Sequence, residues 1–490
     1  DGSLRLSAAV RAALTYTGAT RQAILQRFGA AIRDLSPELS ATPWFDDQWV
    51  TSALDATLET FQSALERWKR LFLQTQAEIA DANNRIQQIS ETNQRHEYRR
   101  QRSIQYRAIL HRESLLNQST PGAQSEFYPL RYLASEGFLP GYNFTRLPIR
   151  ASIPVGDSVE YISRPRSVAI REFGPGNIIY HMGSKYQIER MVVANPESAI
   201  TSAHFCRDSG YLLLGDDVSA NRSPFNDAPL DNENRGSTMF LELAEMQTNR
   251  RDRISCEEET RVNYGYNYAT YFRSSGDVRR IRSAQVQHDG EVFLNLRYIP
   301  ACELYVQNEG WRTARESGFL IGMRSGTWKK SAPSDQQNPD AEPVKRVAIM
   351  THDVFDALYI EPTSVLGLDP DGLVTLQYAL QRGIELIFRM ESSELASVLM
   401  GSATAPNILL YEAAEGSLGI LKQFVSDDTI MASVAERVYQ LLRYDDPDYV
   451  AEASYSDLLS YYNQRHHDRI NRYAIEKALD LLRHATVVPA

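Results

Sequence analysis

The spacing of apolar residues predicts that residues 1–120 are helical. From Trp49 to Phe72, apolar side chains recur at steps of three and four residues, which places them on one face of a helix. The same period continues to Leu116, and Thr120-Pro121-Gly122 ends it. A helical pattern of this length is typical of a long antiparallel helical hairpin.

The pattern changes in residues 125–330. Short segments rich in valine, isoleucine, tyrosine and phenylalanine alternate with glycine and proline, as at 177–180 and 291–298. Such segments predict strands joined by turns, and therefore a β-rich region with loops. The aromatic- and arginine-dense block at 127–144 is predicted to form ordered loops and short strands.

A polar, proline-containing linker at 331–343 precedes a region of mixed pattern at 344–490. Alternating strand and helix signals favour an α/β domain there. The predicted strands are 347–350, 357–360, 384–388 and 408–411, and the predicted helices are 373–381, 430–442 and 469–482. The fold class is therefore mixed α+β and multidomain, with an N-terminal helical hairpin, a central β-rich region and a C-terminal α/β domain.

Composition adds limits to this picture. The chain has 490 residues, of which 43% are hydrophobic and 23% charged, as in globular proteins of several domains. No apolar run is long enough to span a bilayer, and Cys206, Cys256 and Cys302 are too few for a disulfide framework, so we expect a cytoplasmic protein without membrane contact. The net charge of -10 argues against a uniformly basic surface but allows a local basic groove.

Arginine-rich segments are the candidates for nucleic-acid contact. Guanidinium groups suit phosphate, and tyrosine rings between them offer faces for unpaired bases. Two further arginine groups, within 95–112 and 250–282, are explained as well by a solvated helix face and by ion pairs with the glutamates at 257–259. The candidate binding residues are Arg146, Arg150, Arg164, Arg166, Arg171 and Lys185, interleaved with Tyr142, Tyr161, Tyr180 and Tyr186, and Arg465 near the C-terminus.

Signals for chemistry within the chain are weaker. His352-Asp353 follows a predicted strand and His466-His467 precedes Asp468, so both pairs invite an acid–base or metal role. Adjacent side chains on a helix face different ways, which favours packing for the second pair. A turn with Gly416 and Gly419 would suit a phosphate, although a tight strand-to-helix connection explains it equally well. We predict no catalytic residue and no metal ligand here.

Several motifs occur in order along nearly the whole chain. They are Thr-Pro-Trp-Phe at 42–45, Ala-Leu-Glu-Arg-Trp-Lys at 64–69, the block at 127–144, Asn-Glu-Gly-Trp-Arg at 308–312 and Leu-Leu-Ser-Tyr-Tyr-Asn-Gln-Arg-His-His at 458–467. Together they resemble the region that follows the motor in bacterial DISARM-type superfamily-two helicases, which act in anti-phage defence. The last motif resembles part of a domain of unknown function, also called a zinc-binding domain, that these helicases share with a partner subunit.

The resemblance implies the DNA-binding and partner-docking accessory half of an ATP-dependent helicase. No Gly-x-x-x-x-Gly-Lys-Ser/Thr loop occurs here, so ATP and Mg²⁺ are expected on the missing motor and no cofactor in this chain. The expected partners are single-stranded or duplex-end DNA, the helicase motor region and a second defence subunit with a related C-terminal domain. Because the chain begins at Asp1 and not at Met, we expect the motor on a preceding or separate polypeptide.

One departure from the family concerns zinc. Where the family has two Cys-x-x-Cys pairs, this chain has Ser454 with Asp457, and Cys206 with Ser209. Four soft or imidazole ligands are needed to close a structural zinc site, so zinc binding is not expected here. Packing of Tyr449, Tyr455, Tyr461 and Tyr462 is expected to hold the equivalent turn.

Two alternative functions remain open. The first is a structural scaffold subunit of a defence complex that makes no direct DNA contact, which the acidic net charge favours slightly. The second is an independent hydrolase that uses His352, Asp353, His466 and His467, although the sequence places no partner carboxylates beside them.

Overall fold

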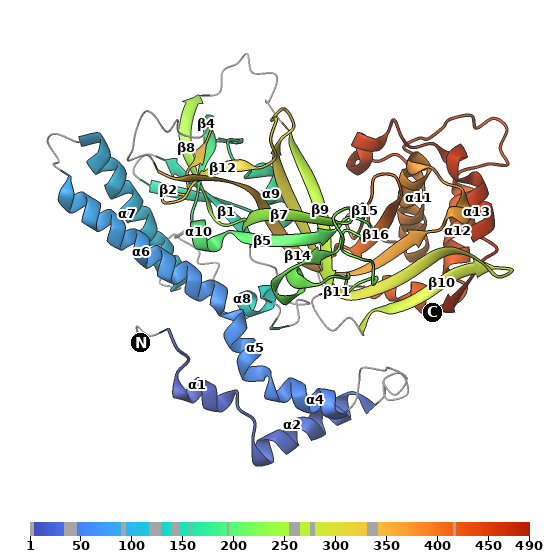
Figure 1. Cartoon of the computed structure of the whole chain (residues 1–490), viewed down its shortest axis with the longest axis horizontal. Helices are drawn as coiled ribbons and strands as arrows, with labels where there is room; N and C mark the ends of the chain where they lie inside the picture. The colour runs from blue at the N-terminus through green and yellow to red at the C-terminus, as the bar shows by residue number, and fades with distance from the viewer. Residues whose placement is uncertain are drawn as a thin grey trace.

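The structure is a computed structural model of the chain (Figure 1). It describes residues 4–33, 47–89, 95–116, 129–136, 138–139, 148–155, 158–193, 196–253, 265–274, 280–330, 342–414 and 418–490. Among these residues, no helix is both long and apolar enough to cross a membrane.

The N-terminal part is helical, as the apolar spacing predicts. Its helices are α1 (Ala8–Ala13), α2 (Gly18–Ala31), α4 (Asp47–Asp55), α5 (Thr57–Ala64), α6 (Glu66–Gln88) and α7 (Arg95–Leu115). Helices α6 and α7 pack side by side along their length and form the predicted hairpin (Figure 1). The helix α8 (Pro129–Ser135) follows, so the prediction of loops and short strands for 127–144 is wrong for these residues.

A five-stranded sheet lies beside the hairpin (Figure 1). Its strand order is β2-β1-β8-β4-β3, and the short helix α9 (Arg166–Glu172) follows β2 directly. Alternate residues of β4 are buried, so the intervening side chains form one outward face. The strands are β1 (Ile149–Val155), β2 (Ser158–Arg164), β3 (Ile178–His181), β4 (Ser184–Met191) and β8 (Met246–Arg253).

A larger sheet of twelve strands forms the centre of the molecule. Its two longest strands, β11 (Glu291–Trp311) and β14 (Val344–Pro362), pair antiparallel and extend from the five-stranded sheet to the C-terminal helices (Figure 1). The other strands are β5 (Thr201–Cys206), β6 (Leu212–Leu213), β7 (Arg235–Glu242), β9 (Tyr266–Ser274), β10 (Arg282–His288), β12 (Phe319–Gly322), β13 (Trp328–Lys329), β15 (Leu395–Gly401), β16 (Pro406–Glu412) and β17 (Thr486–Pro489).

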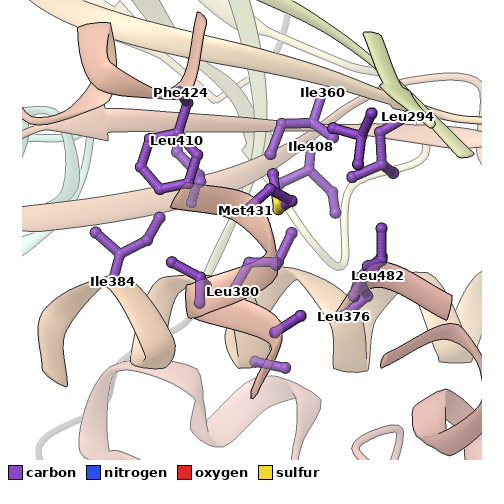
Figure 2. Close-up of a cluster of buried hydrophobic side chains, with 14 of the residues drawn as sticks. Leu294, Ile360, Leu376, Leu380, Ile384, Ile408, Leu410, Phe424, Met431 and Leu482 are labelled. Carbon is purple, nitrogen blue, oxygen red and sulfur yellow. The ribbon is translucent and has the colours of Figure 1, made fainter. Parts of the chain in front are cut away.

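The C-terminal helices cover one face of this sheet and enclose the largest core (Figure 2). Leu380 and Ile384 of α11 (Pro370–Phe388) face Ile408 and Leu410 of β16 in this core. The remaining elements are α10 (Pro196–Ala199), α12 (Ile430–Leu441), α13 (Glu476–Leu482) and the 3₁₀ helices η3 (Gly215–Ser219), η5 (Ser364–Leu366), η6 (Leu421–Val425), η7 (Tyr461–His466) and η8 (Arg472–Ile475).

The predicted strand at 384–388 is wrong, because these residues form the last turns of α11. The run Ile-Glu-Leu-Ile-Phe at 384–388 follows Gly383, and an apolar run this short does not distinguish a strand from the end of a helix. In the structure, helix α11 is covered by the sheet on one side and by α12 on the other. A Cβ on Gly383 would lie 2.5 Å from Val438 of α12, which shows how closely the two helices approach.

The mixed α+β class is confirmed, with helices at the N-terminus and strands through the centre. The predicted domain boundaries stay a prediction. β14, the first strand after the predicted linker, pairs with β7 and β11 of the central region, so the C-terminal region shares its sheet with the region before it.

Candidate nucleic-acid interface

The candidate binding residues on β1 and β2 lie in different surroundings. Arg146 falls outside the described residues. The guanidinium carbon of Arg150 lies 5.7 Å from the ring centroid of Tyr161, so these two side chains are stacked across β1 and β2. Arg164 is 40% exposed and donates to the Glu172 carboxylate at 2.7 Å. Arg164 is therefore a surface cation that already has a carboxylate partner.

Arg166 is buried, with 7% of its side chain exposed. It donates to the carbonyl oxygen of His352 at 3.3 Å and lies 3.8 Å from the Glu242 carboxylate. Burial and the nearby charge of Arg67 lower the pKa of the Arg166 guanidinium. The structure thus places Arg166 between the hairpin and the sheet, where its charge stabilises Glu242.

Arg171 lies beside Tyr268. Its guanidinium carbon is 5.6 Å from the Tyr268 ring centroid. Burial raises the pKa of the Tyr268 hydroxyl, and the charges of Arg171, Arg465 and Arg312 oppose that rise. Arg465 is exposed in η7 of the C-terminal region, and Lys185 lies on the outward face of β4.

The same face of β4 forms one wall of a basic pocket of about 800 Å³. The opposite wall comes from the end of β11, the loop at 312–317, the β12–β13 hairpin and the start of β14. The pocket is lined by the cations Arg251, Arg315, Lys329, Lys330 and Arg346, the carboxylates Glu189 and Glu316, and the indoles Trp311 and Trp328. These residues define what is called the basic pocket below.

Among the residues that the structure describes, the cations that line the basic pocket outnumber the carboxylates by five to two. Arg346 pairs with Glu316 at 2.7 Å, and Lys329 lies 3.8 Å from Glu342. Arg315 and Lys330 are exposed, and no carboxylate pairs with either among the residues that the structure describes. A surplus of positive charge in a concave site attracts polyanions, even on a chain whose net charge is negative.

A neutral side chain orients a third cation of the basic pocket, Arg251. Its Nε and Nη2 atoms donate to the Gln187 Oε1 atom at 2.9 and 2.6 Å. Because the amide of Gln187 carries no net charge, this contact fixes the direction of the Arg251 guanidinium without offsetting its positive charge.

Both indoles of the basic pocket are held by buried aromatic neighbours. The Trp311 ring lies 4.3 Å from the Tyr266 ring, and the Trp328 ring lies 5.8 Å from the Phe319 ring, measured between centroids. Tyr266 and Phe319 are buried, so they fix the orientation of the two indoles. Indoles held in this way beside arginine and lysine suit base stacking next to phosphate contacts.

Local backbone geometry builds the loop that carries Arg315. Gly310 and Gly318 have φ values of 104° and 91°, which side chains rarely adopt. A Cβ on Gly310 would lie 3.0 Å from the Gly318 carbonyl oxygen. The two glycines therefore allow the end of β11 and the start of β12 to approach closely, and the intervening loop is exposed.

A partly buried carboxylate, that of Glu342, anchors the β12–β13 turn. Glu342 accepts from the backbone amide of Arg324 at 2.6 Å and from the Ser325 hydroxyl at 2.7 Å. It also accepts from the Ser325 amide. Because this turn leads into Trp328 and Lys329, Glu342 holds one wall of the basic pocket in place.

Sequence reasoning missed most of the basic pocket. Arg251 belongs to the arginine group at 250–282, which ion pairs with the glutamates at 257–259 explain as well. Trp311 appears only in one of the motifs that carry the family resemblance. Arg315, Lys330 and Arg346 were not singled out at all. The sequence does carry a signal for them, because tryptophan is followed twice by cations, in Trp-Arg-Thr-Ala-Arg at 311–315 and Trp-Lys-Lys at 328–330.

The glycine turn after β16, which could suit a phosphate, binds a carboxylate of the protein. Glu412 is 1% exposed, and its carboxylate accepts from the backbone amides of Gly419 and Leu421, each at 2.9 Å. Those amides are the donors that a phosphate would use. A strand-to-helix connection held by Glu412 therefore explains this turn, and residues 415–417 lie outside the described part.

The histidines have packing partners. His352 stacks on Tyr305 with ring centroids 5.1 Å apart. The Nδ1 atom of His466 lies 2.7 Å from the Tyr378 hydroxyl, and the Nε2 atom of His467 lies 2.9 Å from Asn463 Oδ1. Burial and the charge of Arg469 lower the pKa of His466. Both adjacent histidines thus bind polar groups of the C-terminal region.

Ser454 and Asp457 belong to a polar network. Asp457 is 4% exposed and accepts from the amide and hydroxyl of Ser454 at 2.7 and 2.6 Å. The Tyr449 hydroxyl donates to the same carboxylate. Among the described residues, no group of three or more histidine, cysteine, aspartate or glutamate side chains is placed to hold a metal ion.

Comparison with known proteins gives little further information. No protein-family model matches the chain, and no curated protein matches it. Among solved structures, the DUF1998 helicase MrfA bound to DNA is similar at 13% identity with a TM-score of 0.34, over 76% of this chain and 39% of that one. The same helicase bound to DNA and AMPPNP gives 11% identity and a TM-score of 0.28, over 74% and 34%.

A third structure of this helicase gives 11% identity and a TM-score of 0.27, over 72% of this chain and 37% of that one. This chain therefore spans well under half the length of the structures it matches. At such TM-scores the likeness establishes neither a shared fold nor a shared function.

Proposed function

We propose that this chain binds nucleic acid through the basic pocket. The observation that carries the proposal is the surplus of five cations over two carboxylates around two fixed indoles, on a chain of net charge -10. Cations contact phosphate and set the affinity, and aromatic faces hold bases without regard to sequence. The expected activity is therefore sequence-tolerant binding that weakens steeply as salt rises.

The finer proposal is an accessory half of an ATP-dependent helicase in DISARM-like anti-phage defence. It is supported by the ordered motifs in the sequence, of which Asn-Glu-Gly-Trp-Arg at 308–312 ends beside the basic pocket. In this proposal, ATP and Mg²⁺ bind to the motor region, and this chain holds the DNA as the motor moves it. A second defence subunit docks on the related C-terminal domain.

The experiment that tests DNA binding removes two of the basic-pocket cations that have no carboxylate partner among the described residues. The variant is Arg315→Gln with Lys330→Gln, and labelled DNA of arbitrary sequence is titrated with each protein at low salt. Two lost phosphate contacts are expected to weaken binding about tenfold or more. The matched control is Arg437→Gln with Lys477→Gln, two exposed cations on α12 and α13. Equal affinity of both variants and the unaltered protein would contradict the proposal.

The alternative is a scaffold that holds a motor and a partner together without touching DNA. One observation favours it, namely the polar docking of the hairpin on the sheet, where Arg190 pairs with Glu78 at 2.6 Å. A scaffold requires a rigid connection of this kind. It predicts that Arg315→Gln with Lys330→Gln leaves the complex and its DNA affinity unchanged.

A further inference from the structure

Exposed rings gather in one segment of the C-terminal region. Tyr461 and Tyr462 are 77% and 76% exposed, and their rings lie 6.0 Å apart and nearly perpendicular, so neither covers the face of the other. Large hydrophobic side chains usually bury most of their surface, and several exposed ones in one segment indicate a binding surface. The exposed large side chains of this segment are Val450, Tyr455, Tyr461, Tyr462 and Tyr473.

These rings are held on an ordered support. The Tyr455 ring lies 5.6 Å from the His467 ring, measured between centroids. The Nε2 atom of His467 lies 3.1 Å from the carbonyl oxygen of Ser460, which directly precedes Tyr461. Asn463 is buried and accepts from the Ser460 amide at 2.8 Å. Exposed rings on a fixed backbone lose little conformational entropy when a ligand covers them.

Carboxylates outnumber cations in the same segment. Between residues 443 and 468, all of which the structure describes, the exposed cations are Arg443 and Arg465. The Tyr449 hydroxyl donates to the Ser454 hydroxyl at 2.8 Å, which ties the acidic loop to the backbone beside Tyr455. A surplus of negative charge disfavours a polyanion and favours a cationic occupant. The exposed carboxylates are Asp445, Asp446, Asp448, Glu452 and Asp468, and together with the five large side chains they are called the acidic aromatic surface below.

Tyrosine rings of this segment already bind guanidinium groups. The guanidinium carbon of Arg472 lies 4.2 Å from the Tyr473 ring centroid and 4.8 Å from that of Tyr449. The guanidinium carbon of Arg443 lies 5.1 Å from the Tyr449 centroid. A guanidinium stacks on an aromatic face and pairs with a carboxylate through a planar fork, whereas the ammonium of lysine is a point charge. An exposed surface of tyrosines and carboxylates therefore suits arginine better than lysine.

We propose that the acidic aromatic surface docks an arginine-bearing segment of a partner protein. Guanidinium groups of that segment cover the exposed tyrosine rings and pair with the carboxylates around them. The inference rests on the part of the proposed function in which a second subunit docks on the C-terminal domain, and it gives that docking a place and a chemistry. It does not involve the basic pocket, whose cations repel such a segment.

The probe is a labelled peptide of alternating arginine and glycine, about ten residues long, which when extended crosses an interface of standard size. It is titrated into the full chain at physiological salt, beside a lysine–glycine peptide of equal length. The arginine peptide is expected to bind more tightly than the lysine peptide. Tyr461→Ala with Tyr462→Ala is expected to weaken its binding about fivefold or more, whereas Tyr461→Phe with Tyr462→Phe keeps it.

A second pair of variants tests the charge of the acidic aromatic surface. Asp445→Asn with Asp448→Asn is expected to weaken binding of the arginine peptide about threefold and to reduce its salt dependence. The matched control is Asp216→Asn with Glu233→Gln, which removes two exposed carboxylates of the central region. An equal loss in the control would overturn the proposal, because the peptide would then follow only the net charge of the chain.

Other occupants give different results. Normal binding of the arginine peptide by the alanine variant, or equal binding of the two peptides, would overturn the proposal. It is also overturned if the alanine variant loses affinity for single-stranded DNA instead, or if it loses a dimer that the unaltered chain forms in sedimentation. A purified second subunit that docks equally on the unaltered chain and the alanine variant would overturn this surface and leave the docking proposal standing. Failure of that subunit to dock on either, with the arginine peptide still bound here, would overturn the docking proposal alone.

Discussion

The Asp457 carboxylate accepts two hydrogen bonds from Ser454, one from its amide and one from its hydroxyl, at 2.7 and 2.6 Å. The carboxylate therefore closes the turn at 454–457 through hydrogen bonds within the protein. The Tyr449 hydroxyl completes the network. Tyr455, Tyr461 and Tyr462 were expected to hold this turn by packing as well, but they are 66%, 77% and 76% exposed.

The first prediction concerns metal removal and Asp457. Dialysis against a chelator is expected to leave the melting temperature unchanged, because the turn is held by hydrogen bonds. Asp457→Ala is expected to lower the free energy of unfolding by about 2–3 kcal/mol, since the donors of Ser454 and Tyr449 lose their acceptor. Urea unfolding and zinc analysis of the purified chain measure both effects. Stoichiometric zinc together with a chelator-dependent melting temperature would contradict this account.

The second prediction concerns Arg472, which is 2% exposed beside this turn. Its guanidinium donates to the carbonyls of Ala451 and Leu442 at 2.8 and 2.6 Å and lies 4.2 Å from the Tyr473 ring centroid. A lysine cannot reproduce several hydrogen bonds in one plane. Arg472→Lys is therefore expected to cost about 3 kcal/mol of unfolding free energy, measured by urea unfolding. A loss below about 1 kcal/mol would show that the planar fork is unimportant.

The third prediction separates two neighbouring arginines that the sequence treats alike. Arg166→Ala removes a buried guanidinium that donates to the His352 carbonyl and lies near Glu242, and is expected to cost about 2–3 kcal/mol of unfolding free energy. Arg164→Ala breaks only an exposed pair with Glu172 and is expected to cost less than about 1 kcal/mol. Thermal unfolding of the two variants under one set of conditions makes the comparison. Similar losses would mean that the burial of Arg166 has no energetic consequence.

The fourth prediction is a pH dependence of the wall of the basic pocket. Partial burial would raise the pKa of the Glu342 carboxyl, but hydrogen bonds from Ser325 and Arg324 outweigh it, so the pKa lies below its usual value. A carboxylate with a lowered folded-state pKa stabilises the fold above its unfolded pKa, and this stability is lost as pH falls through the folded pKa.

Below about pH 5, the melting temperature of the unaltered chain is therefore expected to fall by more than that of the Glu342→Gln variant. Melting curves at several pH values give this difference directly. Parallel losses in the two proteins would show that Glu342 does not contribute in this way.

The sequence predicted the elements with a clear period and missed sites assembled from distant segments. The hairpin of α6 and α7 and the strand β16 follow directly from apolar spacing. The end of α11 is mistaken for a strand because its apolar run after Gly383 is too short to show a helical period. Arg166 is buried and Arg164 is exposed, and no local pattern in the sequence distinguishes these two residues.

The basic pocket combines Gln187 of β4 with Arg346 of β14, and only the fold brings these residues together. The expectation that Arg171 and Arg465 act on DNA stays a prediction.

The most direct test of the central claim is the salt dependence of DNA binding. The logarithm of the binding constant is measured against the logarithm of salt concentration for the unaltered chain, for Arg315→Gln with Lys330→Gln, and for the control Arg437→Gln with Lys477→Gln. Each lost phosphate contact is expected to reduce the slope by about 0.7 to 0.9. The basic-pocket variant should therefore show a slope smaller by about 1.4 to 1.8, with the control unchanged. Identical slopes for all three proteins would contradict the claim that the basic pocket holds the nucleic-acid backbone.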